Sequence, residues 1–155
     1  MKTAANAFLA VTVILGVGCA HESASVRYIN APSLSKPPGF SHVVEVSGGR
    51  TLYVTGLVSS DTSGKVVGPG DLRAQTRQVF EKLKTVLAAS GATLDDVVKV
   101  TIFVTDLTDI KSFREVRDSY FLKVSPASTL AQVVRLVQPE FMIEMEAVAV
   151  VRSQK

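Results

Sequence analysis

The strongest constraint on the fold is a change of hydrophobic period along the chain, from two residues to about 3.6 and back again. Helical spacing marks the segments 72–87 and 110–121, in which apolar residues recur every three or four positions. Between them, residues 97–105 form a run rich in β-branched side chains, long enough for a strand at the centre of a sheet. The chain is therefore expected to pack helices against a sheet in one layered domain.

Four longer strands and one short strand complete the predicted sheet. They are placed at residues 43–46, 51–58, 130–137 and 142–151, with the short one at 27–29. Gly48 and Gly49 lie between the first two and indicate a hairpin. Asp71 is a suitable N-cap for the first helix, and Gly91 suits the position just beyond its end. The predicted order after the optional first strand is β-β-α-β-α-β-β, an α+β fold with two helices on one face of a mixed sheet.

The N-terminus has the features of an export signal. Lys2 supplies a positive charge, and residues 7–17 are almost entirely apolar but too short to span a membrane comfortably. Small residues then precede Cys19, as in a bacterial lipobox, which predicts cleavage after residue 18 and acylation of Cys19. Gly16 stands where leucine is usual, so plain secretory cleavage and an uncleaved anchor stay open as alternatives. Ala20, after the cysteine, favours the outer membrane.

The predicted organisation is a signal peptide at 1–18, a lipidated cysteine with a tether at 19–38, and one domain at 39–155. The 155 residues suit a single domain. Their formal net charge is +3, and the cations are spread out rather than gathered beside aromatic residues, so no nucleic-acid partner is expected. We expect an exported protein held on the periplasmic side of the membrane through Cys19, or a periplasmic or secreted one without acylation.

Six short segments, taken in order, carry a further signal. They read Gln-Thr-Arg-Gln-Val at 75–79, Leu-Asp-Asp-Val-Val-Lys-Val-Thr at 94–101, Thr-Asp-Leu at 105–107, Ser-Pro-Ala-Ser-Thr at 125–129, Val-Val-Arg-Leu at 133–136 and Ile-Glu-Met-Glu-Ala-Val-Ala at 143–149. Together they resemble the RidA/YjgF family, whose best-known members hydrolyse enamines and imines. The resemblance spans residues 39–151. It implies the chorismate-mutase-like fold, a homotrimer, and a small-molecule cleft between subunits.

The resemblance also implies which residues would bind substrate. In the family, the segment matching 125–129 carries an arginine that grips the substrate carboxylate, and that position is Ser128 here. A hydroxyl can donate a hydrogen bond, but it cannot make the bidentate, charge-assisted contact of a guanidinium. Phe40 stands where the family usually has tyrosine, and Leu57 where it has glutamine. The pocket is therefore expected to be less polar and less cationic than in the deaminases.

One carboxylate and one cation complete the candidate site. Strand alternation puts Glu144 and Glu146 on the same face of a strand that continues as an apolar run. The resemblance matches Glu146 to the glutamate that positions the attacking water, and it is the predicted catalytic residue; two solvated edge glutamates are the alternative. Arg114 matches a pocket asparagine on the second helix, or else is a solvated arginine near Glu115 and Asp118.

Three functions are consistent with these residues. The first is an exported RidA-like hydrolase acting on C=N bonds, of the imine or enamine deaminase type, with an altered substrate range. The second is a trimer that binds a small ligand in the same cleft without chemistry, and a remote third is a ribonuclease. Whether the chain is an enzyme stays open. The sequence has no spacing typical of zinc, calcium-loop or P-loop sites, so no metal or other cofactor is expected.

Overall fold

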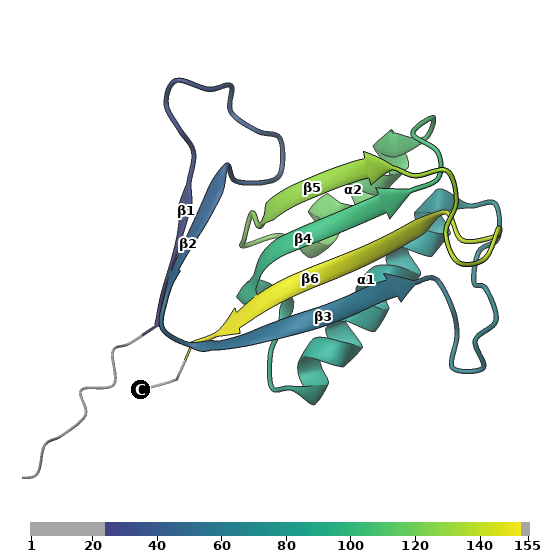
Figure 1. Ribbon diagram of the computed structural model, residues 1–155, viewed down its shortest axis with the longest axis horizontal. Coiled ribbons are helices and arrows are strands. Elements are labelled where there is room, and N and C mark those ends of the chain that lie inside the picture. The colour runs from purple at the N-terminus through teal and green to yellow at the C-terminus, as the bar shows by residue number, and fades with distance from the viewer. Residues whose placement is uncertain (1–23, 153–155) are drawn as a thin grey trace, which may run out of the picture.

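The computed structural model describes residues 24–152, and the predicted signal peptide and Cys19 lie outside this range. Its elements follow the predicted order, including the short first strand (Figure 1). They are β1 (Ser25–Ile29), β2 (Val43–Ser47), β3 (Arg50–Val58), α1 (Leu72–Ala89), a 3₁₀ turn η1 (Leu94–Asp96), β4 (Val97–Val104), α2 (Ile110–Tyr120), β5 (Ala127–Gln132) and β6 (Ile143–Val151). β1 thus lies within the segment 19–38 that was expected to be a tether.

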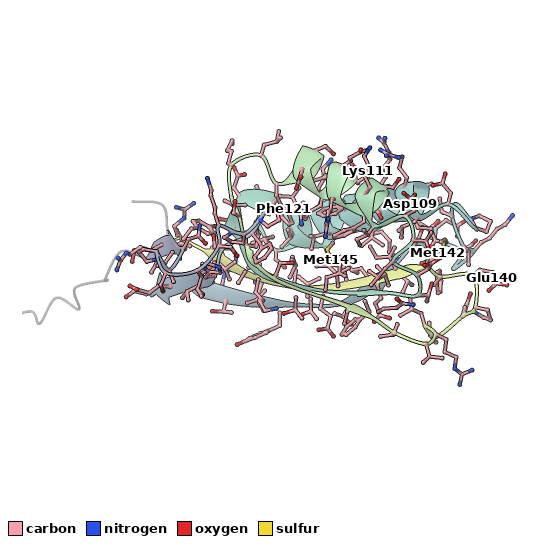
Figure 2. All side chains as sticks on the ribbon, turned by 90° about the horizontal axis from the view of Figure 1, so that it is seen from above. Asp109, Lys111, Phe121, Glu140, Met142 and Met145 are labelled. Atoms are coloured by element: carbon pink, nitrogen blue, oxygen red, sulfur yellow. The ribbon has the colours of Figure 1, made fainter. Side chains whose placement is uncertain are left out.

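The main sheet has four strands in the order β3-β6-β4-β5. β4 and β5 run parallel, whereas β6 is antiparallel to both β3 and β4, so the sheet is mixed as predicted. Both helices cover the same face of the sheet (Figure 2). Within residues 24–152, no helix lies over the opposite face, which we call the open face.

β2 departs from the predicted hairpin, because it pairs with β1 instead of β3. The two strands form a separate antiparallel sheet, in which Val26 lies opposite Val46 and Tyr28 opposite Val44. Figure 1 shows this pair, which we call the arm, turned sharply away from β3. The two glycines between β2 and β3 were correctly placed at a bend. A turn signal does not fix the strand that supplies the hydrogen bonds, and here β1 supplies them.

The first helix forms where the apolar spacing predicted it. The Asp71 carboxylate accepts a hydrogen bond from the amide of Ala74 at 2.9 Å and caps the N-terminus. The chain leaves the helix through Gly91, whose φ of 67° suits the residue after a helix end. Leu87 contributes its side chain to the core and its carbonyl to the amide of Ala92 at 2.9 Å. The capping residues and the apolar stripe therefore place the two ends of α1 at the same positions.

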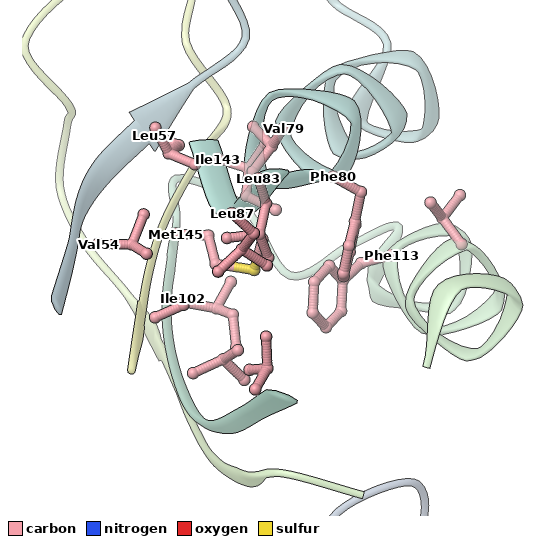
Figure 3. Close-up of a cluster of buried hydrophobic side chains, with 14 of the residues drawn as sticks. Val54, Leu57, Val79, Phe80, Leu83, Leu87, Ile102, Phe113, Ile143 and Met145 are labelled. Carbon is pink, nitrogen blue, oxygen red and sulfur yellow. The ribbon is translucent and has the colours of Figure 1, made fainter. Parts of the chain in front are cut away.

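The core lies between the two helices and the sheet. Val54, Ile102 and Met145 come from three neighbouring strands, Phe80 comes from α1, and Phe113 comes from α2 (Figure 3). All five side chains are buried. Neither helix is long and apolar enough to cross a membrane in the part of the chain that the structure describes. The apolar stripes of the helices are accounted for by this core.

β5 begins and ends earlier than the predicted strand at 130–137. Its parallel pairing with β4 starts at Ala127 and ends where Val104 lies opposite Gln132. β4 itself ends at Val104, whose carbonyl accepts a last hydrogen bond from the amide of Val133 at 2.8 Å, and beyond this point residues 24–152 offer no partner strand. Val134 is consequently fully exposed and Val137 is 80% exposed. Their β-branched side chains suggested a strand, but the length of the neighbouring strand decided where it ends.

Candidate functional site

The predicted catalytic residue lies on the open face. Glu146 stands opposite Thr101 of β4, and its side chain is exposed. A cavity of about 250 Å³ lies beside it and includes Tyr53 and Lys99 in its lining. In the single chain Glu146 is thus exposed to solvent, although most of the strand that carries it is buried. The apolar run after it fills the helix-facing positions and the far end of β6, whereas residue 146 points away from the helices.

Lys99 is the principal cation of this open-face cavity. Its Nζ donates hydrogen bonds to Thr129 Oγ1 and to the main-chain oxygen of Val100, each at 3.0 Å, and to Thr101 Oγ1 at 3.3 Å. Burial lowers the pKa of Lys99, and the charge of Glu146 acts in the opposite direction. Because its donors are already used by neutral oxygens, the ammonium is held in a fixed position near the Glu146 carboxylate.

Glu144 has a different environment from Glu146, although both point to the open face. It lies opposite Phe103 of β4 and Val58 of β3, and it is half-buried. Its carboxylate rests against Gly56, where an added Cβ would overlap with Oε1. The pairing of β3 with β6 shifts register between Val54 and Leu57, so this contact falls at an irregular step in the sheet. Bulges of this kind commonly redirect side chains near functional sites.

Ser128 lies on the other face of the sheet. It is in register with Val100, whose side chain is buried beneath the helices, whereas its neighbour Thr129 receives the Lys99 hydrogen bond on the open face. Within one chain, Ser128 and Glu146 therefore point to opposite sides. A cleft containing both would need two copies of the chain.

Phe40 is placed near the beginning of β5 by the loop between β1 and β2. The next residue, Ser41, forms a parallel bridge with Ala127, and its amide donates to the carbonyl of Pro126 at 3.3 Å. Phe40 is half-buried and lines a cavity of about 280 Å³. The structure thus brings Phe40 close to the strand that carries Ser128, as a shared site requires.

A buried arginine behind this loop was missed by the sequence analysis. Arg117 of α2 is only 7% exposed; its Nε donates to Asp118 Oδ1 at 2.8 Å, and its Nη2 donates to the carbonyl of Pro38 at 3.3 Å. Gly39 has a φ of 73°, and a Cβ there would overlap with the guanidinium. Position 39 therefore requires glycine both for its backbone angle and for its contact. The loop sequence Ser-Lys-Pro-Pro-Gly at 35–39 gave no signal of this anchor.

The two remaining predicted substrate residues differ in position. Leu57 is 6% exposed and belongs to the core beneath the helices, so it does not open onto a cavity in the single chain. The register shift before it turns residue 57 inward and leaves Gly56 toward Glu144. Arg114 is exposed on α2.

Within residues 24–152, no group of three or more histidine, cysteine, aspartate or glutamate side chains is placed to hold a metal ion.

Comparison with known proteins identifies the family. A protein-family profile described as "Endoribonuclease L-PSP" matches residues 30–151. The 3-aminoacrylate deaminase RutC of Acinetobacter baylyi is 36% identical over 123 residues, which are 79% of this chain and 97% of that protein. The crystal structure of the conserved Rid-family protein YyfB from Yersinia pestis is 37% identical, covers 81% of this chain and 98% of its own, and has a TM-score of 0.76. This chain belongs to the RidA/YjgF family.

Membership of the RidA/YjgF family confirms the resemblance and the fold inferred from the six segments. A further relative is the 2-iminobutanoate/2-iminopropanoate deaminase of Dermatophagoides farinae, which is 31% identical over 126 residues, or 81% of this chain and 96% of that protein. The family match begins at residue 30, just after β1. The arm is thus only partly covered by the family match.

Proposed function

We propose that this RidA-family protein hydrolyses C=N bonds of small imines or enamines in a cleft shared by two copies of the chain. The proposal is supported by the names of two relatives, which are deaminases of an enamine and of imino acids. In such a reaction, water attacks the carbon of the C=N bond, the nitrogen gains protons and leaves as ammonia, and a carbonyl remains. The protein must supply a proton acceptor for the water and contacts that orient the substrate.

The observation that carries the proposal is the contact of Glu144 with Gly56. The glycine backbone lets the carboxylate pack closely against the strand and holds it in place, and half-burial excludes much of the bulk solvent. Glu146 matched the family acid in the sequence analysis, but it lies exposed beside Lys99. We therefore assign the proton acceptor to Glu144 and keep Glu146 as the alternative.

The experiment compares Glu144→Gln with Glu146→Gln. Each change keeps shape and hydrogen bonding but removes the proton acceptor. With 2-iminopropanoate generated in the assay, release of 2-oxopropanoate by Glu144→Gln should fall by about 10²–10⁴-fold, while Glu146→Gln keeps most of the activity. The reverse pattern would return the role to Glu146. If both variants match an active wild type, the chemistry lies elsewhere.

A non-catalytic ligand-binding protein is the second candidate function. It is favoured by the substitutions at the site, since Ser128 cannot provide the charged contact of an arginine and Phe40 has no hydroxyl. Under this alternative, wild type binds a small molecule in the shared cleft but shows no release of carbonyl product above the uncatalysed rate. The same assay, run beside a binding titration, distinguishes the two functions.

We also propose that the protein is a homotrimer. Trimers are typical of this family, and the separation of Ser128 from Glu144 on opposite faces supports a site completed by another copy. The open face offers the exposed Tyr53, 84% accessible, for a subunit contact. Sedimentation should give three times the monomer mass, and a stable monomer would contradict the proposal.

The proposed location is the periplasmic side of the outer membrane, through acylated Cys19. The apolar segment at 7–17 and the small residues before the cysteine support it. Cys19→Ser should move the protein from the membrane fraction to the soluble one, or block its processing. A wild-type protein that is already soluble and begins beyond residue 19 would show that the alternative, plain secretion, is correct.

A further inference from the structure

A separate cavity lies between α1 and the loop that follows β3, which we call the helix-side cavity. Figure 1 shows that this loop continues from the end of β3 that points away from the arm. The volume of the cavity is about 440 Å³, within the usual range for small-molecule pockets. Its walls include loop and helix residues, namely Ser60, Asp61, Thr62, Lys82, Thr85 and Val86. All of them come from one chain and none belongs to the site proposed above, so the cavity depends neither on a second copy nor on the proposed hydrolysis.

The ammonium group of Lys82 is held at the wall of this cavity by neutral oxygens. Its Nζ donates to the carbonyl of Val58 at 2.9 Å and to Ser60 Oγ at 2.8 Å. Within residues 24–152, Lys82 forms no ion pair. An ammonium group has three N–H donors, so one of them remains for a ligand. The cavity thus has a positive group in a fixed position with no carboxylate bound to it.

Asp61 fixes a negative charge in the same cavity. Its Oδ1 accepts hydrogen bonds from the Ser63 hydroxyl at 2.7 Å and from the amides of Ser63 and Lys65, each at 2.9 Å. The bond from the Ser63 hydroxyl, those from the two amides and, least, the charge of Lys65 lower the pKa of Asp61, so its carboxyl group is ionised at neutral pH. Its other oxygen, Oδ2, accepts no hydrogen bond in the part of the chain that the structure describes, and it is available to a ligand.

The remaining carboxylate in the lining, Glu81, is already paired. It binds Lys84 at 2.9 Å and accepts a hydrogen bond from the Tyr120 hydroxyl at 2.7 Å. Lys82 and Asp61 therefore supply the free charges of the cavity, and among the described residues they form no ion pair with each other. Two opposite charges kept apart in this way suit a ligand that carries both charges. Because each side chain is already oriented by its own hydrogen bonds, it loses little entropy when the ligand binds.

We propose that the helix-side cavity binds a free α-amino acid with an apolar side chain. Lys82 and the Ser60 hydroxyl donate hydrogen bonds to its carboxylate, and Asp61 accepts from its ammonium group. Val86 is 39% exposed and provides an apolar surface for the side chain of the ligand. Thr85 donates its hydroxyl to a carbonyl of its own helix at 2.9 Å, which leaves its methyl group for the same contact.

The test is a calorimetric titration of the full-length protein with L-leucine and with two probes that each lack one of its charges. 3-Methylbutylamine lacks the carboxylate and 4-methylpentanoate lacks the ammonium group, so L-leucine should bind more tightly than either. Lys82→Gln and Asp61→Asn, the latter keeping the Oδ1 acceptor, should each weaken L-leucine binding by about two- to fivefold, the range for exposed charges.

The two probes also show which residue binds which end of the ligand. Lys82→Gln should not weaken binding of 3-methylbutylamine, and Asp61→Asn should not weaken binding of 4-methylpentanoate, because each variant loses a contact that the probe cannot make. Asp106→Asn is the matched control for Asp61, since Asp106 likewise accepts from the amide and hydroxyl of Thr108 but lies outside the lining. Lys111→Gln, on α2 and also outside the lining, is the control for Lys82. Neither control should change L-leucine binding.

Several outcomes would overturn this inference. If wild type does not bind L-leucine, the cavity is not an amino-acid site. If neither Lys82→Gln nor Asp61→Asn weakens L-leucine binding, the amino acid binds elsewhere on the protein. If glycine binds as tightly as L-leucine, the selection for an apolar side chain is wrong. A thermal melt accompanies each titration, and if Lys82→Gln unfolds through loss of its bonds to Val58 and Ser60, Asp61→Asn decides the question.

Discussion

The carboxylate of Glu144 occupies the space that a side chain at Gly56 would fill. This contact lies where β3 shifts register against β6, and it gives position 56 a direct influence on the proposed proton acceptor. The negative φ of Gly56 leaves the backbone compatible with alanine, so the effect of a substitution there comes from the Glu144 contact rather than from backbone strain.

Gly56→Ala should therefore lower the rate of hydrolysis strongly while changing the free energy of unfolding little. The methyl group displaces a flexible carboxylate, and misplacement of a reacting group by about 1 Å can cost up to roughly a hundredfold in rate. Steady-state kinetics with 2-iminopropanoate and a thermal melt measure the two effects. In a Glu144→Gln background the same change should have no further effect on rate. An additive loss in the double variant would show that Gly56 acts independently of Glu144.

Ser128→Arg should raise activity on 2-imino acids. An arginine restores a charge-assisted contact worth roughly 1.5–3 kcal/mol, which corresponds to about ten- to a hundredfold in rate. Ser128→Met is the control for side-chain length without charge. Activity is measured as kcat/KM for 2-iminopropanoate. A wild-type kcat/KM equal to that of an arginine-bearing relative would contradict the argument from Ser128. If Ser128→Arg leaves kcat/KM unchanged, either Phe40 limits the reaction or the pocket no longer supports catalysis.

Gln75→Leu should strongly destabilise the fold. Gln75 is fully buried, and its amide donates to the carbonyl of Glu140 at 2.7 Å while its oxygen accepts from the amide of Met142 at 2.8 Å. Leucine leaves both main-chain groups without these partners, which costs about 3 kcal/mol in the free energy of unfolding. Urea denaturation measures the loss. Gln78→Leu, which removes one bond to Ser60 from a less buried position, should cost less; equal losses would refute the role of this network.

Stability should decline as the pH rises from about 10 to 12, in part through Tyr120. Burial and the hydrogen bond to Glu81 raise the pKa of Tyr120 to about 12. Between the unfolded value near 10 and this folded value, the unfolded chain releases a proton that the folded chain retains, so the free energy of unfolding falls with rising pH. Below pH 10 this contribution is fully present.

Tyr120→Phe should flatten that alkaline decline while lowering stability at neutral pH. Urea midpoints measured from pH 8 to pH 12 give both effects. Tyr53→Phe is the control, because Tyr53 is exposed and lies on the other face of the sheet. An unchanged alkaline slope in Tyr120→Phe would assign the decline to other groups, among them Tyr28, whose pKa is also raised, chiefly by burial.

Sequence reasoning succeeded where local chemistry decides the structure. The apolar stripe and the two ends of α1 were predictable, because Asp71 and Gly91 act within a few residues of themselves. It failed where a distant strand decides the outcome, since the partner of β2 and the end of β5 depend on β1 and β4. The motif residues directed attention to β5 and β6, but the different surroundings of Glu144 and Glu146 depend on a register shift between β3 and β6. Arg117 was missed because its contacts with Pro38 and Gly39 join residues far apart in the chain.

The position of β6 between β3 and β4 has a consequence for the order of folding. β6 follows every other strand of residues 24–152 in the sequence, yet it pairs with β3 on one side and with β4 on the other. A nascent chain that lacks residues 143–151 has two disconnected parts of a sheet and cannot close its core. Closure of the core must therefore wait for residues 143–151, and pairing across so long a stretch of chain is slow. Slow closure of this kind is compatible with the proposed export, which requires a chain that is still unfolded when it enters a translocation channel.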